Sequence, residues 1–336
     1  MIQHVLIPLD GSPVAELAIA HGAALAQGSD AHVTLFRAVD MGQPRDFSSA
    51  AIESRLRRAE ARSYLDEKAA ELTAGGIRTR VVVHEGPAAD AISEYAREES
   101  VDLIALCTHG EGGVGAFPMG SVAWKVVADG ATSIMLVRAH GQEADRPSTD
   151  YGTVMVPVDG SPQADWALCH AAGIARAQGA ELLIVQAVPI PEMTRRLPAT
   201  SDDKKLQRGL TRANRRAAHA NLREGKCCLA SEDLAVRTHV EVTPQVAETL
   251  HRIARDERVG LVVASAHGSS GPARSAYGSV AAHLIHHGET PTLVFQDAPQ
   301  CRRGTSRSAR AEVHATAWDQ RVTSDETQLS GNGVGT

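Results

Sequence analysis

The chain has 336 residues, of which 43% are hydrophobic, 22% are charged and 3% are aromatic, and its formal charge is −6. This length suffices for two domains that each bury a core. The negative charge argues against non-specific nucleic-acid binding, and no stretch approaches the roughly 20 apolar residues that a membrane span needs. The N-terminal residues show no signal-peptide pattern, and the five cysteines include no C-x-x-C pair. A reduced, cytoplasmic compartment is therefore predicted.

The first part of the chain alternates strand and helix patterns. Residues 2–9 predict a strand, and Ser12 or Asp10 can cap a helix that begins at Pro13. Further strands are predicted at 32–38, 78–83, 101–106 and 133–137, with helices between them. Such alternation is typical of a parallel sheet with helices on both faces, which binds ligands at the carboxyl ends of its strands.

A glycine-rich segment follows the strand at 101–106. It leaves the strand at Cys107-Thr108-His109-Gly110 and enters a helix at Gly120-Ser121-Val122. Glycines remove side chains from a sharp turn, and a helix N-terminus presents N–H groups that suit phosphate. Ser121 offers a hydroxyl there, or serves as an ordinary N-cap. Because Asp10 ends a neighbouring strand, Asp10 and the Gly110 loop are predicted to share one site, although Asp10 alone could simply cap a helix.

This pattern occurs a second time. Val154 to Pro162 repeats Val5 to Pro13, and the later strands are predicted at 182–188, 236–242, 260–264 and 292–295. Ser265-Ala266-His267-Gly268 and Gly278-Ser279-Val280 repeat the loop, with nine residues between the first glycine and the Gly-Ser pair in both copies. Two matched copies are much stronger support for a ligand loop than one.

The repeat predicts two similar domains in tandem. The expected bounds are 1–140 for the first domain, 141–150 for a linker, 151–298 for the second domain and 299–336 for a disordered tail. Residues 189–216 are longer than their partner in the first copy and carry eight Lys and Arg residues. This segment is expected to lie outside the repeated unit, either as an interaction surface or as the solvated face of a helix.

The combination of these motifs resembles the universal stress protein family over residues 1–297. The resemblance rests on Pro8-Leu9-Asp10-Gly11-Ser12, on 85–92, on 101–104, and on Thr-His-Gly followed after nine residues by Gly-Ser-Val. It implies two doubly wound, Rossmann-like α/β domains of the adenine nucleotide alpha-hydrolase-like fold. Each would have a five-stranded parallel sheet with helices on both faces, and the two would pair through their last strands as an intramolecular pseudo-dimer. Association of two chains as a homodimer stays open.

The resemblance also implies a stress-response regulatory or sensor protein that binds ATP, with or without Mg²⁺. Asp10 and Asp159 match the family's aspartate near the adenine, and Val39 and Val188 match the valine whose backbone meets the base. The predicted cofactor-binding residues of the first copy are Pro8, Asp10, Val39, Cys107, His109, Gly110, Gly120, Ser121 and Val122. Those of the second are Pro157, Asp159, Val188, Ser265, His267, Gly268, Arg274, Gly278, Ser279 and Val280.

The chain departs from the family pattern at its first glycine. Cys107 and Ser265 stand there, and their β-carbons would crowd the ribose. The first loop carries Glu111 and the second Arg274, which predicts tighter nucleotide binding at the second site. Because the chain has no Gly-Lys-Ser/Thr motif and its loops have no clear carboxylate for Mg²⁺, at most slow hydrolysis is expected, and no catalytic residue is assigned. The alternatives are a nucleotide-free scaffold or interaction protein, and a nucleotide-dependent transfer enzyme of related fold.

Two further features have open interpretations. Cys107 is either a packed thiol or a redox switch. His283, His286 and His287 have a spacing that suits a metal, or they complement the end of a helix dipole, and no metal is predicted. The expected partners are an adenine nucleotide and a regulatory protein that reads the bound state, without a nucleic acid or a membrane.

Overall fold

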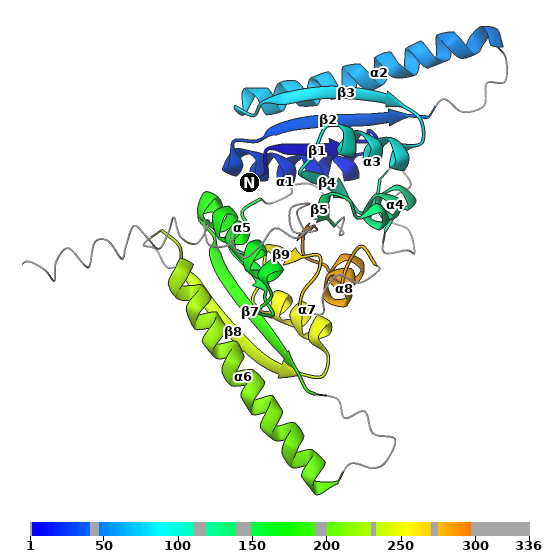
Figure 1. The fold of residues 1–336 in the computed structure, drawn as a ribbon. Helices are drawn as coiled ribbons and strands as arrows, with labels where there is room; N and C mark the ends of the chain where they lie inside the picture. Colours follow the sequence, from blue (N-terminus) through cyan, green and yellow to red (C-terminus); the bar gives the residue numbers. More distant parts are fainter. Residues whose placement is uncertain are drawn as a thin grey trace, which may run out of the picture. The chain divides into compact units, whose positions relative to one another are not determined.

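The computed structural model describes residues 2–40, 47–110, 119–138, 149–191, 200–229, 233–269 and 275–296, and Figure 1 shows their helices and strands. The predicted tail and most of the predicted linker lie outside the described residues, as do Glu111 and Arg274. Within the described part of the chain, no helix is long and apolar enough to cross a membrane.

The two halves have the same order of elements. The first half contains β1 (His4–Pro8), α1 (Pro13–Ser29), β2 (His32–Val39), α2 (Phe47–Ala74), β3 (Thr79–Glu85), α3 (Ala88–Glu98), β4 (Leu103–Cys107), α4 (Ser121–Asp129) and β5 (Ser133–Val137). The second half contains β6 (Thr153–Pro157), α5 (Pro162–Gln178), β7 (Glu181–Pro189), α6 (Ser201–Leu229), β8 (Val236–Thr243), α7 (Val246–Asp256), β9 (Leu261–Ser265), α8 (Ser279–His287) and β10 (Thr292–Phe295).

The ten strands form one sheet in the order β3-β2-β1-β4-β5-β10-β9-β6-β7-β8. All neighbours within each half are parallel, and the halves meet where β5 pairs with β10 in antiparallel register, with Leu136 opposite Thr292 and Ile134 opposite Val294. The predicted pairing through the last strands is confirmed, and it joins the two five-stranded sheets into one. The order of strands within each half puts the topological switch point between β1 and β4, and between β6 and β9.

Helices cover both faces of the sheet. Strand residues alternate between the two faces, so that Leu35 packs with Leu17 of α1 and Leu65 of α2, whereas Phe36 packs with Ile92 of α3 and Val126 of α4. The second half repeats the arrangement, with α5 and α6 on the face of α1 and α2. Aliphatic side chains and alanine form most of these cores, as the low aromatic content predicts.

For residues 201–216, which belong to α6, the prediction that 189–216 lie outside the repeated unit is wrong, and residues 192–199 lie outside the described residues. Helix α6 has 29 residues and α2 has 28, and both pack on the two strands at the outer edge of their half. The basic residues of α6 lie on a helix whose inner positions, Ala218 and Leu222, are buried like Ala61 and Leu65 of α2. The exposed residues of α6 differ from those of α2. The two helices therefore correspond in sequence at these buried positions and not on their exposed faces.

Candidate functional site

A carboxylate follows the first strand of each half and lies against the glycine loop after the fourth. In the first half, Oδ1 of Asp10 accepts hydrogen bonds from the backbone N–H of Ser12 at 2.9 Å and from its hydroxyl at 2.6 Å. The other oxygen, Oδ2, lies so close to the α-carbon of Gly110 that a methyl group there would collide with it. Asp10 therefore joins the loop after β1 to the loop after β4.

The second half reproduces this arrangement. Oδ1 of Asp159 accepts from the N–H of Ser161 at 2.9 Å, and Oδ2 accepts from the N–H of Ser269 at 2.6 Å. A methyl group at Gly268 would collide with Oδ2 of Asp159. Burial raises the pKa of this carboxyl, but the hydrogen bonds from Ser161 and Ser269 outweigh burial and lower its pKa overall. Asp159 is consequently ionised at neutral pH.

The aspartates are not the helix caps. Ser12 caps α1 by accepting from the N–H of Ala15 at 3.1 Å, and Ser161 caps α5 by accepting from the N–H of Ala164 at 3.2 Å. Of the two capping residues that the sequence allowed for α1, the structure selects Ser12. Each aspartate instead holds the capping serine in position and leaves its second oxygen to the glycine loop.

The N-termini of α4 and α8 carry no side-chain cap. Gly120 is the N-cap of α4 and Gly278 that of α8, both with extended backbone and no side-chain hydrogen bond to the first turn. Ser121 and Ser279 are the first helical residues and are exposed, so the interpretation of Ser121 as an ordinary N-cap is wrong. The first N–H groups of a helix have no intrahelical partner, and within the described part of the chain no side chain caps them, so they suit a ligand.

The loops are closed at their ends by matched backbone bonds. The N–H of Gly120 donates to the carbonyl of Thr108 at 2.7 Å, and that of Gly278 donates to the carbonyl of Ala266 at 2.8 Å. Each bond brings the helix N-terminus next to the end of β4 or β9. The predicted residues Val122 and Val280 lie in the first turns of these helices, with 40% of Val122 exposed.

The remaining predicted residues lie at the same edge of the sheet. Pro8 and Pro157 end β1 and β6. Val39 and Val188 lie at or near the ends of β2 and β7 and are buried, and the carbonyl of Val39 accepts from the N–H of Gly86 at 3.1 Å. Arg274 lies outside the described residues. The structure thus brings all the other predicted residues to the two strand-end regions, nine in each half.

The residues beside the loop glycines are engaged with their neighbours. Cys107 ends β4 and is 7% exposed, and burial raises the pKa of its thiol, which disfavours the reactive thiolate. Nδ1 of His109 lies 3.1 Å from the hydroxyl oxygen of Thr108. Nε2 of His267 lies 3.1 Å from the carbonyl oxygen of Ser275 and donates to it, which ties the far side of the second loop to β9.

Each site has a neighbour that the sequence patterns did not reveal. The guanidinium of Arg37, on β2, lies over the ring of Tyr64 and beside Gly11, where a β-carbon would be 3.2 Å from Nη1. In the second half, Asn221 of α6 takes the corresponding place beside Gly160, and Gln186 stands where β2 has Arg37. An alignment of the two copies shows the Arg-to-Gln difference, and only the fold shows that it lies next to the candidate site.

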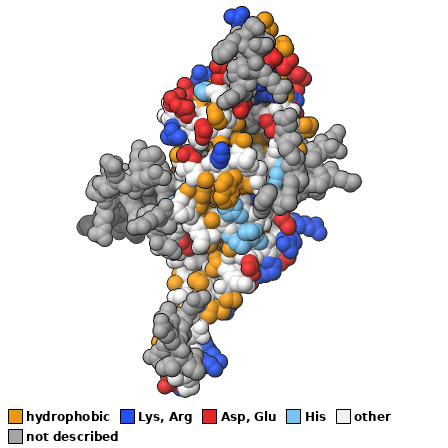
Figure 2. Space-filling view, turned by 90° about the vertical axis from the view of Figure 1, so that its right-hand side faces the viewer, with side chains coloured by type: hydrophobic (Ala, Val, Ile, Leu, Met, Phe, Trp, Pro, Cys, Tyr) orange, Lys and Arg blue, Asp and Glu red, His pale blue; other side chains and the backbone are white. Residues whose placement is uncertain are grey.

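The histidines of α8 belong to a larger group. The ring of His283 lies 5.1 Å from that of His251 on α7 and 4.6 Å from that of His287, and His286 lies 5.0 Å from Trp124 of α4. Figure 2 shows histidines gathered on one face beside hydrophobic side chains. Burial and neighbouring histidines lower the pKa of His251 and of His286. Among the residues that the structure describes, no group of three His, Cys, Asp or Glu is arranged to hold a metal ion.

The sequence profile of the universal stress protein family matches residues 1–138 and 150–296. The chain belongs to the universal stress protein family. It carries two universal stress protein domains in tandem, and members of this family often bind adenine nucleotides. A universal stress protein of Thermus aquaticus is 35% identical over 143 residues, which are 41% of this chain and the whole of that protein. One of Methanocaldococcus jannaschii is 29% identical over 147 residues, covering 43% of this chain and 86% of that protein.

Solved structures support the tandem fold. A universal stress protein from Archaeoglobus fulgidus aligns with a TM-score of 0.62 and 18% identity, covering 88% of this chain and 98% of that one. A putative universal stress protein from Pseudomonas aeruginosa aligns with a TM-score of 0.60 and 18% identity, covering 88% of this chain and 93% of that one. At these identities the likeness concerns the fold alone.

Proposed function

We propose that this universal stress protein is a regulatory module that binds ATP at two sites, one at the carboxyl ends of the strands in each half. The observation that carries the proposal is the matched pair of Asp10 with Gly110 and of Asp159 with Gly268. In each pair a carboxylate fills the space beside a glycine, so that the two loops at the switch point are held together. That geometry occurs twice, at the place where sheets of this class bind ligands.

The uncapped N-termini of α4 and α8 suit the phosphates. Their first N–H groups have no side-chain partner in the described residues, and the helix dipole favours an anion there. By family resemblance, the aspartates and the valines at Val39 and Val188 would face the adenine and ribose. Bound nucleotide would contact two loops of one half at once, and it would shift the protein between states by binding one state more tightly.

Slow turnover at most is part of the proposal. A general base needs a side chain within hydrogen-bond reach of an attacking water, and the two candidate histidines are already engaged, His109 with Thr108 and His267 with Ser275. The free thiols of Cys107 and Cys227 fit a reduced compartment such as the cytoplasm.

Calorimetric titration of the full chain with MgATP tests the proposal. We expect two nucleotides per chain, one per chain for Gly110→Ala and for Gly268→Ala, and none for the double variant, because each methyl group displaces the aspartate beside it. Gly209→Ala is the matched control, since that glycine lies in α6 with no atom near its missing β-carbon. Absence of binding to the unmodified chain at millimolar MgATP would contradict the proposal and favour the nucleotide-free scaffold.

A further inference from the structure

A pocket lies at the amino ends of the strands, whereas the candidate nucleotide sites lie at their carboxyl ends. It has a volume of about 570 Å³ and is formed in the second half by the end of α7, the end of α8, and the segment that enters β10. Val262 and Thr292, which line it, are at the amino ends of β9 and β10. Pockets of this size hold small organic ligands.

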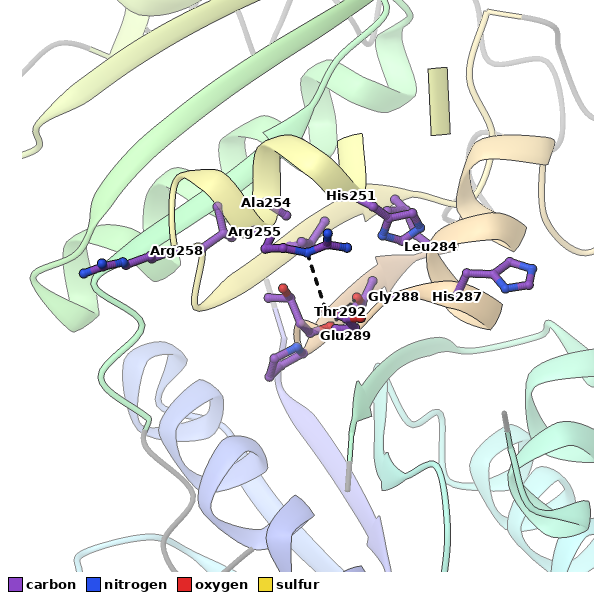
Figure 3. Close-up of a pocket in the computed structure, with 13 residues that line it drawn as sticks. His251, Ala254, Arg255, Arg258, Leu284, His287, Gly288, Glu289 and Thr292 are labelled. Carbon is purple, nitrogen blue, oxygen red and sulfur yellow. Dashed lines mark hydrogen bonds and ion pairs between the residues drawn. The ribbon is translucent and has the colours of Figure 1, made fainter. Parts of the chain in front are cut away.

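The pocket has an apolar floor and a cationic rim. Ala254, Val259, Val262 and Leu284 supply buried aliphatic surface. Arg255 and Arg258 line the rim from α7 and the following turn, with His287 at the other end (Figure 3). Glu289 is the single carboxylate among the lining residues, so the lining has a net charge of +1 even when its histidines are neutral.

The arginines are not needed to cap the helices that end there. The carbonyls of Ala254 and Ile253 in the last turn of α7 accept the N–H groups of Val259 at 2.8 Å and Glu257 at 2.9 Å. In α8 the carbonyl of Leu284 accepts from the N–H of Gly288 at 3.0 Å. Because the backbone satisfies these carbonyls, the arginines are not held as helix caps, and Figure 3 shows the guanidinium of Arg255 over the pocket while that of Arg258 extends away from it.

The charge of Arg255 is only weakly compensated. Its guanidinium lies 3.8 Å from the carboxylate of Glu289, and the two side chains are 68% and 69% exposed. Figure 3 shows Arg255 extending from α7 toward Glu289. Exposed pairs at this distance contribute little free energy, so an incoming anion can take the place of Glu289. The buried Nε2 of His251, on the wall of the pocket, has no hydrogen-bond partner within the described structure.

The first half lacks this excess of positive charge. At the positions of Arg255 and His287 it has Arg97 and Asp129, which form an ion pair at 3.9 Å. Ser93 and Ser100 stand where the second half has His251 and Arg258. The two halves have the same fold here and differ in charge. The positive charge around the pocket of the second half is therefore not required for folding.

We propose that this pocket binds a small organic anion with an apolar body, such as a phosphate monoester, with the anion on Arg255, the body on the aliphatic floor, and Arg258 adding positive charge at the rim. Glu289 competes with the ligand for Arg255. The site is separate from the proposed ATP sites and does not depend on them.

The probe is phenyl phosphate, titrated into the full chain and followed by the imidazole proton resonances of His251 and His287, assigned through His251→Asn and His287→Asn. We expect saturable shifts, weakened about tenfold or more in Arg255→Ala/Arg258→Ala and strengthened a few-fold in Glu289→Gln. Arg208→Ala/Arg212→Ala and Glu60→Gln are the matched controls, since they change two and one exposed charges on α6 and α2, which do not line the pocket.

Several results would overturn the proposal. Equal effects of the control variants would mean general charge attraction, and unchanged shifts in the double arginine variant would mean that the anion binds elsewhere. Loss of the shifts in excess MgATP would place phenyl phosphate at the nucleotide sites. If inorganic phosphate bound as tightly as phenyl phosphate, the aliphatic floor would contribute nothing to binding. Shifts that survive both phosphate and MgATP competition and respond to Glu289→Gln support it.

Discussion

The guanidinium of Arg138, which follows β5 in the first half, donates a hydrogen bond to the carbonyl of Leu284 in the second half at 3.2 Å and also donates to Ile285. It thereby satisfies the last turn of α8 from across the junction of the two halves. Burial lowers the pKa of Arg138 to about 10, so the guanidinium stays charged at neutral pH. The cation is held at the negative end of a helix dipole, where it is stabilising.

Replacing Arg138 with methionine should destabilise the fold. The variant keeps most of the apolar stem and removes a charged donor from two carbonyls, which costs about 1.5–3 kcal/mol. Urea unfolding followed by circular dichroism measures the change. The control is Arg62→Met, whose exposed partner Asp66 lies one turn away on α2, and which should change stability by less than about 0.5 kcal/mol. Equal stabilities of Arg138→Met and the unmodified chain would mean that water replaces the guanidinium.

The stability of the protein should fall on mild acidification because of His21. This side chain is buried, its Nδ1 lies 3.1 Å from the hydroxyl oxygen of Tyr151, and burial lowers its pKa to about 4. In the unfolded chain His21 takes up a proton near pH 6.5. The contribution of neutral His21 to the free energy of unfolding is therefore complete above pH 6.5, and up to about 3 kcal/mol of it is lost as the pH falls toward 4.

His21→Gln should flatten this dependence, since glutamine does not titrate. Urea midpoints at pH 7.5, 6.5, 5.5 and 4.5 give the comparison, and His219→Gln, on the exposed face of α6, is the control with an unchanged slope. His170 adds an effect of the same sign, because burial lowers its pKa to about 4 as well. An unchanged slope in His21→Gln would mean that the pKa of His21 is the same in the folded and the unfolded chain.

Arg37 should strengthen nucleotide binding at the first site. Its charge lies beside Gly11 in the loop that carries Asp10, and the second half has Gln186 in its place. In the Gly268→Ala background, which leaves the first site, Arg37→Gln should weaken ATP binding about threefold to tenfold, as expected for one charge acting over several ångströms. In the Gly110→Ala background, Gln186→Arg should strengthen it. Calorimetry measures both.

Arg80→Gln is the control with the same change of charge, because Arg80 lies at the amino end of β3, away from the candidate site. If Arg80→Gln weakened ATP binding as much as Arg37→Gln, the effect of Arg37 would come from the net charge of the protein and not from its place beside Gly11. The tighter binding predicted for the second site from Glu111 and Arg274 stays a prediction, and Arg37 acts against it. The affinities of the two single-site backgrounds decide which charge dominates.

Cys107 should react more slowly than Cys227. Burial raises the pKa of its thiol, whereas Cys169 and Cys227 are exposed. Iodoacetamide labelling at pH 8, read by peptide mass, should modify Cys227 at least about ten times faster than Cys107. Faster labelling of Cys107 would revive the redox-switch interpretation.

The sequence predicted the strands and the repeat well because buried parallel strands are short apolar runs and each occurs twice. It could not decide between Ser12 and Asp10 as the cap of α1, since both residue types accept from the first turn, and the choice depends on where Gly110 lies. The assignment of 189–216 failed because exposed helix positions tolerate divergence. Arg37, Asn221 and the contact of His251 with His283 were not predictable, because they depend on distances between elements far apart in the chain.

The antiparallel pairing of β5 with β10 has an evolutionary consequence. A single-domain relative that assembled two copies along this strand would have to carry every substitution twice, once in each subunit. In the present chain the two halves are encoded separately, so one can change while the other is conserved. Arg37 against Gln186 and Asp129 against His287 are differences of this kind. Two separately encoded halves therefore allow the two proposed nucleotide sites to differ in affinity, and the proposed anion site to exist in one half only.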